Sequence, residues 1–329
     1  MMPRAWHLKS RPQGMPTQAN FELQHVDLPS LDEGMIQVRN RWLSVDPYMR
    51  GRMNDVKSYV PPFQLGEPME GGAIGEVVES KTEGFAPGDL VQHMSGWRDE
   101  AVVAARAVNK LPDLGVPPEQ FLGILGITGA TAYFGLLEVA KAKSGDVVFV
   151  SAAAGAVGSA VVQIAKAKGM TVIGSAGGPE KCEFVRALGA DTAIDYRAAP
   201  ILKGLAAAAP DGIDVYFDNV GGDHLDAALA LARNYARFAL CGMIENYNDP
   251  TPPTFRFVMR IIGARIRLQG FIVSDYLPRM GEFYAAMGPW VASGAIKSHE
   301  TVVEGLENMP EAFLGLFSGA NTGKMLVRP

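Results

Sequence analysis

The chain has few cysteines and no long run of like charges. Only two cysteines, Cys182 and Cys241, occur among 329 residues, so neither a disulfide framework nor a four-thiolate zinc site can form. The 30 basic and 35 acidic residues leave a formal net charge of −5, and no basic tract offers a surface for nucleic acid. These shortages argue against nucleic-acid partners and favour a reducing, cytoplasmic compartment.

Convincing membrane and targeting segments are also missing. Residues 1–14 carry basic side chains, but no apolar core follows them, so they do not read as a secretory signal. The uncharged stretches 120–137 and 147–165 approach the length of a membrane span, but polar and glycine residues interrupt both. We therefore expect no membrane partner.

The first 120 residues indicate a β-rich unit. Short apolar runs are separated by Pro and Gly turn signals, and they lie at Met35–Val38, Gly72–Val78 and Leu90–His93. With 48% hydrophobic residues the chain can bury a sizeable core, and its length suggests roughly two domains. This pattern predicts an all-β, barrel-like domain at the N-terminus.

After residue 120 the pattern changes to alternating strands and helices. We expect strands at Val147–Val150, Thr171–Ile173, Thr192–Ile194, Val215–Phe217 and Phe238–Leu240, and helices at Gly129–Lys141, Ser159–Lys168 and Glu180–Leu188. Such alternation is typical of βαβ units and predicts a doubly wound parallel sheet. Ala264–Val273 reads as an edge strand, Met309–Phe317 as a helix and Lys324–Val327 as a closing strand.

These patterns together define an α/β fold with two domains. We expect residues 1–125 and 297–329 to form the β-rich domain, and residues 126–296 to form the doubly wound domain. A site would then lie outside the carboxyl ends of the parallel strands.

The turn after Val147–Val150 carries the strongest motif. Ala153, Gly155 and Gly158 occupy the three small positions of a dinucleotide fingerprint, between a predicted strand and a predicted helix. Gly155, Ala156, Val157 and Gly158 would hold a pyrophosphate at the helix N-terminus. The alternative is an ordinary tight α/β turn, and the alanine at the first position keeps that alternative open.

The segment after the second strand favours NADP(H) over NAD. Residues 174–178 read GSAGG and lack the carboxylate that would bind a ribose 2′-hydroxyl. Lys181 follows and could attract a 2′-phosphate, and Tyr196 and Arg197 follow the third strand. By position alone, Lys181 could equally be a solvated helix lysine.

Eight segments carry a resemblance to a known family. The chain resembles the zinc-independent medium-chain dehydrogenases/reductases, and within them the leukotriene B4 12-hydroxydehydrogenase/prostaglandin reductase group with alkenal double-bond reductases and bacterial curcumin reductase. The matching segments, in order along nearly the whole chain, are VDPYMRGRM (45–53), GWRDE (96–100), LGITGATAYFGL (125–136), AAAGAVGS (152–159), YFDNVGG (216–222), CGMIENYN (241–248), GFIV (270–273) and GANTGKM (319–325).

The resemblance implies a Rossmann cofactor domain, a GroES-like substrate domain and NADPH-dependent reduction of the C=C bond of α,β-unsaturated ketones and aldehydes. It also implies a homodimer joined through the predicted edge strand. The cofactor-binding residues that it implies, besides the pyrophosphate turn, are Thr131, Lys181, Tyr196, Asn219, Cys241, Gly242, Ile244, Tyr247, Phe271, Ile272, Val273 and Asn321.

Zinc-using relatives within this superfamily place a Cys where this chain has Asp46 and a His where it has Met69. Asp46 and Met69 do not make a credible ligand pair of nitrogen and sulfur, and the five histidines are scattered without ligand spacing. We therefore expect no metal site.

Without a metal, another group must polarise the substrate carbonyl. Hydride delivered to the β-carbon leaves negative charge on the carbonyl oxygen, and a donor aimed at that oxygen stabilises the transition state. The family segment CGMIENYN makes Tyr247 the candidate catalytic donor, although it could instead simply line the pocket. Expected pocket residues are Tyr48, Trp97, Met243, Tyr247 and Phe271, and Arg50 is either near the substrate mouth or structural.

Two other functions stay open at this point. The chain could be an NADPH:quinone reductase of the same superfamily, although Tyr247 and the long segment 248–260 favour the enone reductase. It could also be an NADPH-binding protein without turnover. The natural substrate, the stereochemistry and the proton donor to the α-carbon cannot be read from the sequence.

Overall fold

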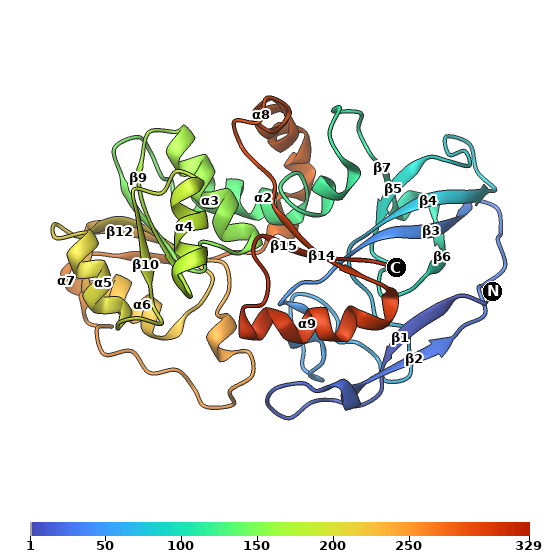
Figure 1. The fold of residues 1–329 in the computed structure, drawn as a ribbon, viewed down its shortest axis with the longest axis horizontal. Coiled ribbons are helices and arrows are strands. Elements are labelled where there is room, and N and C mark those ends of the chain that lie inside the picture. The colour runs from blue at the N-terminus through green and yellow to red at the C-terminus, as the bar shows by residue number, and fades with distance from the viewer. Residues whose placement is uncertain (1) are drawn as a thin grey trace. The chain divides into compact units, whose positions relative to one another are not determined.

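The computed structural model describes residues 2–329 and divides the chain into two compact units. Unit 1 consists of Met1–Leu122 and Glu300–Pro329, and unit 2 consists of Gly123–His299. Both boundaries lie three residues from those expected from the sequence. Figure 1 shows the units in colours that follow the chain.

Unit 1 is built on a largely antiparallel sheet in the order β14-β15-β3-β4-β5-β7, with β6 also paired to β3 and with β1 and β2 forming a separate hairpin pair. Its strands are β1 (Arg4–Leu8), β2 (Phe21–His25), β3 (Met35–Ser44), β4 (Ala73–Ser80), β5 (Leu90–His93), β6 (Glu100–Ala104), β7 (Asn109–Lys110), β14 (Glu300–Glu304) and β15 (Lys324–Arg328). Its α-helices are α1 (Met49–Arg52) and α9 (Met309–Ser318). Its larger apolar cluster includes Trp6, Met69, Trp97 and Phe313, and a second, smaller cluster includes Ile36 and Val91.

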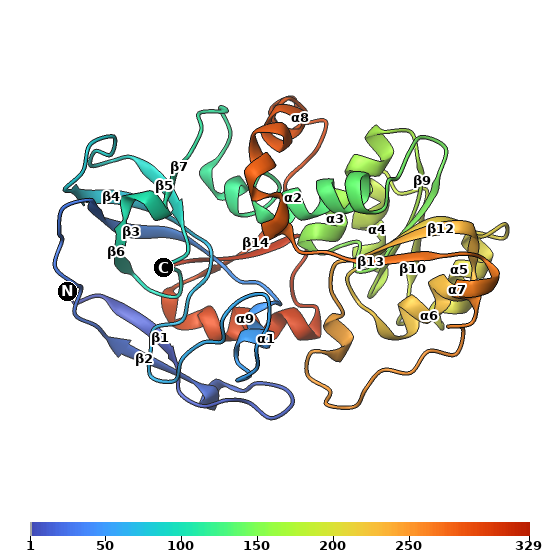
Figure 2. The ribbon, with the colours of Figure 1, turned by 180° about the vertical axis from the view of Figure 1, so that it is seen from behind.

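Unit 2 is a six-stranded parallel sheet in the order β10-β9-β8-β11-β12-β13. Its strands are β8 (Val147–Val150), β9 (Thr171–Ala176), β10 (Thr192–Asp195), β11 (Ile213–Asp218), β12 (Ala232–Leu240) and β13 (Arg267–Gly270). Its helices are α2 (Ile127–Phe134), α3 (Ala156–Ala167), α4 (Pro179–Ala187), α5 (Ile201–Ala208), α6 (Gly222–Ala230), α7 (Arg260–Gly263) and α8 (Met280–Ala292). Figure 2 shows β12 and β13 from behind, at one edge of this sheet.

The strand order of unit 2 reverses between β8 and β11. From β8 the chain runs outward through β9 to β10, and it then returns to pair β11 with the other side of β8. Such a topological switch point, at the carboxyl ends of parallel strands, is where α/β proteins bind their ligands. The fold therefore directs attention to the turns after β8 and β11.

The predicted α/β fold with a β-rich N-terminal unit is confirmed, and the predicted strand Val147–Val150 has the bounds of β8. Two elements differ. The helix predicted at Gly129–Lys141 ends as an α-helix at Phe134 and continues as a π-helical turn over Gly135–Val139. Of the predicted edge strand Ala264–Val273, only Arg267–Gly270 is a strand, because Ala264 is the C-cap of α7, Arg265 has a φ angle of 52° and a 3-10 helix begins at Val273. Among residues 2–329, no helix is long and apolar enough to cross a membrane.

Candidate functional site

The turn between β8 and α3 brings the backbone of the chain unusually close to itself. A Cβ on Gly158 would lie 2.2 Å from the carbonyl oxygen of Ala152, so no other residue fits there. Gly155 is the N-cap of α3 with extended backbone, and it is half-exposed together with Ala156 and Val157. The exposed N-terminus of a twelve-residue helix supplies N–H groups and a positive dipole end, which fits a pyrophosphate.

Ala153, the first small position of the fingerprint, is fully buried beneath this turn. Its backbone N–H donates to the carbonyl of Ser175 at 2.9 Å, which ties the turn to β9. A Cβ on Gly174 would lie 2.7 Å from the Cβ of Ala153, so the glycine in β9 makes room for the alanine in the turn. The departure from glycine at position 153 is therefore accommodated by a second small residue.

A cationic cluster lies at the end of β9 and β10. The hydroxyl of Tyr196 and the Nε of Arg197 lie 2.7 and 2.9 Å from the position of a Cβ on Gly177. Burial lowers the pKa of Lys181, and the nearby charge of Arg197 lowers it further. The structure thus brings together Lys181, Tyr196 and Arg197, the three residues considered for a 2′-phosphate from the sequence.

Asp195, which directly precedes Tyr196, is already engaged. One of its oxygens accepts the backbone N–H groups of Gly178 and Arg197, both at 2.9 Å. These hydrogen bonds lower the pKa of Asp195. Asp195 therefore shapes the loop, while the cations face the region after Gly177.

The switch point is held by a buried hydrogen-bond network around Asp218. One carboxylate oxygen accepts the Tyr216 hydroxyl at 2.6 Å and the Ser151 hydroxyl at 3.2 Å. The same oxygen accepts the N–H groups of Val220 and Gly221 at 2.9 and 2.8 Å. Complete burial raises the pKa of Asp218, and these donors oppose the rise.

Asn219 lies on top of this network and links β8 to β11. Its side-chain amide donates to the carbonyl of Ser151 at 2.8 Å, and its N–H donates to the Ser151 hydroxyl at 2.9 Å. The family resemblance implies that Asn219 is a cofactor residue, and the structure places it on this network. Tyr216 and Asp218 lie in the same segment, YFDNVGG, but were assigned no role, and Ser151 directly follows β8.

The segment after β12 folds onto the same edge. The N–H groups of Cys241 and Gly242 donate to the carbonyl of Asp218, and that of Ile244 donates to the carbonyl of Asn219. The hydroxyl of Tyr247 lies 2.9 Å from the position of a Cβ on Gly242. Five expected site residues from two segments are therefore adjacent at this edge: Asn219, Cys241, Gly242, Ile244 and Tyr247.

The side chains of this segment differ in what they can do. Burial raises the pKa of the Cys241 thiol to about 12, so it is no nucleophile at neutral pH. Met243 is half-buried and packs against Gly221 and the core of unit 2. Tyr247 carries a phenolic O–H, which is a hydrogen-bond donor.

Phe271 and Thr131 are packed in unit 2 as well. The Phe271 ring lies edge-on to Phe217, with ring centroids 6.1 Å apart, and it fills the space beside Gly135. The Thr131 hydroxyl donates to Ile127 within α2 at 2.7 Å. Ile272 and Val273 follow β13, whose carboxyl end lies at the same sheet edge as those of β11 and β12.

Three expected site residues lie in unit 1. Trp97 is fully buried and stacks on Phe21, with ring centroids 5.8 Å apart, so the expectation that it lines a substrate pocket is wrong. Tyr48 is half-buried, and burial raises its pKa. The Asn321 side-chain amide donates to the carbonyl of Gly323 at 2.7 Å.

Arg50 has a structural environment. Its guanidinium donates to Asn54 and to the carbonyl of Gly14, both at 2.8 Å, and it is 3% exposed. Arg52, two residues further along the chain, forms an ion pair with Glu70 at 2.7 Å.

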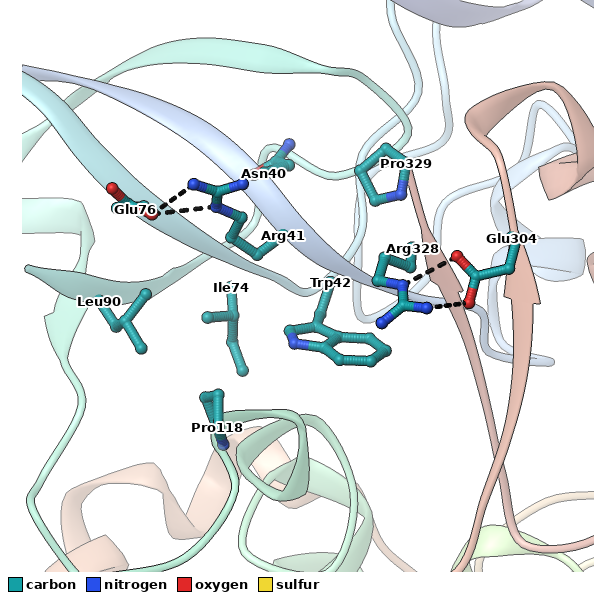
Figure 3. A pocket seen from close by; sticks show the side chains of 10 residues that line it. All are labelled: Asn40, Arg41, Trp42, Ile74, Glu76, Leu90, Pro118, Glu304, Arg328 and Pro329. Atoms are coloured by element: carbon teal, nitrogen blue, oxygen red, sulfur yellow. Dashed lines mark hydrogen bonds and ion pairs between the residues drawn. The ribbon is translucent and has the colours of Figure 1, made fainter. Parts of the chain in front are cut away.

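A hollow of about 500 Å³ opens on unit 1 (Figure 3), over β3, β4 and β5. Its lining combines apolar side chains with two arginine–glutamate pairs, and the residues drawn there are Asn40, Arg41, Trp42, Ile74, Glu76, Leu90, Pro118, Glu304, Arg328 and Pro329. Within the described part of the chain, its lining includes none of the residues expected at the active site.

Asp46 and Met69 stand at the two positions where zinc-using relatives were expected to place ligands, and both have other contacts. Asp46 binds the ammonium of Lys324 at 2.7 Å, and Met69 is fully buried in the core of unit 1. Across residues 2–329, no group of three or more His, Cys, Asp or Glu side chains could hold a metal ion. This donor chemistry does not fit the ligands of a zinc site.

Comparison with known proteins identifies the family. Two family models match: the N-terminal domain of oxidoreductase over residues 4–111 and zinc-binding dehydrogenase over residues 156–292. The NADPH-dependent curcumin reductase of Escherichia coli (strain K12) is 43% identical, covering 99% of this chain and 96% of its own. The chain belongs to the medium-chain dehydrogenase/reductase family. The resemblance inferred from the sequence motifs is thereby confirmed.

Other members of the family extend the comparison. The 2-alkenal reductase (NADP(+)-dependent) of Nicotiana tabacum is 41% identical, covering 97% of this chain and 95% of its own. The crystal structure of CurA from Vibrio vulnificus in complex with NADPH matches with a TM-score of 0.93 and 44% identity, covering 99% of this chain and 98% of that chain. The Escherichia coli quinone oxidoreductase complexed with NADPH has 22% identity and a TM-score of 0.80, and it shares the fold.

Proposed function

We propose that this medium-chain dehydrogenase/reductase is an NADPH-dependent reductase of the C=C bond of α,β-unsaturated ketones and aldehydes. The observation that carries the cofactor assignment is the cluster of Lys181, Tyr196 and Arg197 around Gly177. Two cations and a phenol suit a phosphate dianion, whereas an NAD site would present a carboxylate to the ribose. The NADPH in the Vibrio vulnificus CurA structure supports this assignment.

The residues of unit 2 fit the remaining parts of the dinucleotide. Gly155 to Gly158 hold the pyrophosphate at the start of α3. Asn219, Cys241, Gly242 and Ile244 frame the nicotinamide end with their backbone, which the Asp218 network holds rigid. Thr131, Phe271, Ile272 and Val273 are proposed to border this end, and Asn321 is proposed as a further cofactor-binding residue.

Tyr247 is the proposed catalytic residue. NADPH, when bound, supplies a hydride to the β-carbon of the enone. The Tyr247 hydroxyl donates a hydrogen bond to the carbonyl oxygen, where negative charge develops, and so lowers the barrier. The α-carbon then takes a proton from water, which completes the saturated ketone or aldehyde.

The substrate class is supported by the relatives and by the chemistry of the site. The names of the tobacco and Escherichia coli relatives specify reduction of 2-alkenals and of curcumin. A phenolic donor is suited to a carbonyl oxygen, and Asp46 and Met69 provide no zinc ligands for the same task. Tyr48, Met243 and Phe271 are proposed to border the substrate.

We propose further that the enzyme is a homodimer. β13 is the edge strand of the six-stranded sheet, and Gln269 and Gly270 on it are exposed. An unpaired edge can extend into a second copy of the same sheet. Multi-angle light scattering tests this assembly, and a monomer at all concentrations would contradict it.

A panel of acceptors tests the activity. Oxidation of NADPH is followed by absorbance with 2-hexenal, 4-phenylbut-3-en-2-one and a benzoquinone, and the products are identified by mass spectrometry. We expect turnover of the enal and the enone, with loss of the C=C bond and retention of the carbonyl. Turnover of the quinone alone, or NADPH binding without turnover of any acceptor, would refute the proposed reaction.

A further inference from the structure

Lys324 is a buried cation at the start of β15. The residue is 3% exposed, and its ammonium donates to the carbonyl of Val45 at 2.8 Å and to the Asp46 carboxylate at 2.7 Å. The other carboxylate oxygen of Asp46 accepts the hydroxyl of Ser44. Lysine is almost never buried to this extent unless it is paired. The position therefore calls for a physical reason.

The pair closes the junction between β3 and α1. The β15 ladder ends beside β3, where Leu326 pairs with Ser44 and the N–H of Val45 donates to the carbonyl of Met325. β3 ends at Ser44, and the chain then leaves the sheet. The ammonium of Lys324 binds Asp46 just after this point. The carbonyl of Asp46 accepts the N–H of Met49, so the same residue also begins α1.

Tyr48 lies within this short anchored segment. It is the residue before α1 and follows Asp46 and Pro47, whose ring fixes its own φ angle. Its side chain packs against the core of unit 1. Burial and the charge of Asp46 raise the pKa of Tyr48, so the phenol stays protonated and able to donate.

We propose that Lys324 is a positioning residue for the enone substrate, because its bond to Asp46 fixes the place of Tyr48. The inference rests on the proposed function, since it requires Tyr48 to border the substrate. It adds a residue that touches neither substrate nor cofactor. Buried ion pairs are weak sources of stability but can specify one arrangement of the chain, which suits such a role.

The first test is the Lys324→Met variant, which keeps the length of the side chain and removes its charge. We expect kcat/KM for 4-phenylbut-3-en-2-one to fall about 10- to 100-fold, because small displacements of positioning groups are costly. We expect the Kd of NADPH to change by less than about twofold, since the proposed dinucleotide contacts in unit 2 are untouched. An equal loss in NADPH affinity would overturn the proposal.

A double-mutant cycle separates positioning from general destabilisation. If Lys324 acts through Tyr48, then Lys324→Met will cost little further activity in a Tyr48→Ala background. Additive losses would show that Lys324 acts by another route and would overturn the proposal. Rates are expressed per NADPH-binding site, so a smaller folded fraction does not enter the comparison.

Two further variants complete the test: one is a control, and the other replaces Lys324→Met if that variant does not fold. Arg328 lies on β15, as Lys324 does, and forms an exposed ion pair with Glu304 of β14. The variant Arg328→Met removes this pair, and we expect it to have wild-type kinetics. If Lys324→Met does not fold, the variant Lys324→Met with Asp46→Asn leaves no uncompensated charge. Wild-type kcat/KM in that variant would refute the positioning role.

The same cycle distinguishes failure of this inference from failure of the proposed function. If the wild-type protein reduces quinones but no enones, the proposed function is wrong. The coupling between Lys324 and Tyr48 is then measured with the quinone, and non-additive losses would still support a positioning role at the substrate side. Additive losses with either acceptor would refute it.

Discussion

The hydroxyl of Tyr196 lies against Gly177, 2.7 Å from the place that a Cβ on this glycine would take. Arg197 approaches the same point with its Nε at 2.9 Å. The glycine after β9 therefore does more than turn the chain, because its missing side chain is what allows a phenol and a guanidinium to converge. The proposed 2′-phosphate site depends on this close approach between residues from two successive loops.

Replacing Gly177 by Ala is expected to disturb this convergence with little effect on folding. The added Cβ displaces the far ends of Tyr196 and Arg197, which can move at low cost, but it displaces them from the phosphate. We expect the Kd of NADPH to rise about tenfold and the Kd of NADH to change little, as measured by calorimetry.

Gly281→Ala is the matched control for this change. Gly281 lies in α8, and a Cβ there would meet nothing within 4 Å. We expect unchanged NADPH affinity and a slightly higher Tm, because alanine favours helix over glycine. Equal NADPH affinities in the two variants would argue against the role of Gly177.

Lys181→Ala tests the charge of the same cluster. Removing the ammonium takes away an attraction for the 2′-phosphate, which NADH lacks. We expect NADPH affinity to fall about 10- to 100-fold and NADH affinity to change by less than about twofold, as expected for a charge-assisted contact. Binding titrations with both cofactors at two salt concentrations measure this difference.

Lys203→Ala, on the exposed face of α5, controls for a general loss of positive charge. It should leave the affinities for both cofactors unchanged. If Lys181→Ala weakened NADPH and NADH equally, Lys181 would have no specific role toward the phosphate.

Features that depend on neighbouring residues could be predicted from the sequence, whereas features that depend on distant residues could not. The strand Val147–Val150, the glycine pattern after it and the NADP-type loop are local patterns, and the structure contains them. The Asp218 network could not be predicted, because Ser151 and Asp218 are 67 residues apart and meet only through strand pairing. Arg197 was considered beside Tyr196, but only the folded loop brings it to Gly177.

For Trp97, the sequence led to a wrong expectation about exposure. Trp97 lies in the family segment GWRDE (96–100) and was expected to line the substrate pocket. In the structure it is fully buried, with Phe21 stacked on it and Phe313 against its edge. Burial of a loop aromatic depends on distant segments, here β2 and α9, which the local pattern does not reveal.

Tyr247→Phe tests the proposed catalytic donor. Phenylalanine keeps the ring and removes only the hydroxyl that lies over Gly242. Loss of a donor that stabilises developing negative charge typically costs about 100-fold in kcat. We expect a loss of that order with enals and enones, measured under NADPH saturation, and nearly unchanged NADPH affinity. An unchanged kcat would remove Tyr247 from the mechanism.

His224 provides a pH-dependent prediction for unit 2. The ring is 6% exposed and lies between Phe149 and Tyr196, and neither of its nitrogens has a hydrogen-bond partner within the described residues. Burial lowers its pKa from 6.5 to about 4, although the charge of Asp223 opposes this. His224 is therefore neutral in the folded protein down to about pH 4.

The sign of the effect follows from proton binding. Between pH 6.5 and 4 the unfolded chain binds a proton at this position and the folded chain does not, so stability falls as the pH falls through this range. A shift from 6.5 to about 4 corresponds to roughly 3 kcal/mol of unfolding free energy at full effect. The folded protein has the whole of this stability above pH 6.5 and loses it as the pH falls toward 4.

His224→Phe should remove this part of the acid sensitivity. Phenylalanine fits a slot already bordered by aromatic rings, and it leaves no buried nitrogen unpaired. Urea unfolding at pH 7 and pH 4.5 should show a smaller difference for the variant than for the wild type. His93 in unit 1 also has a pKa lowered to about 4 by burial, so some sensitivity remains. The exposed His25 (His25→Phe) is the control, and an equal reduction there would contradict the assignment to His224.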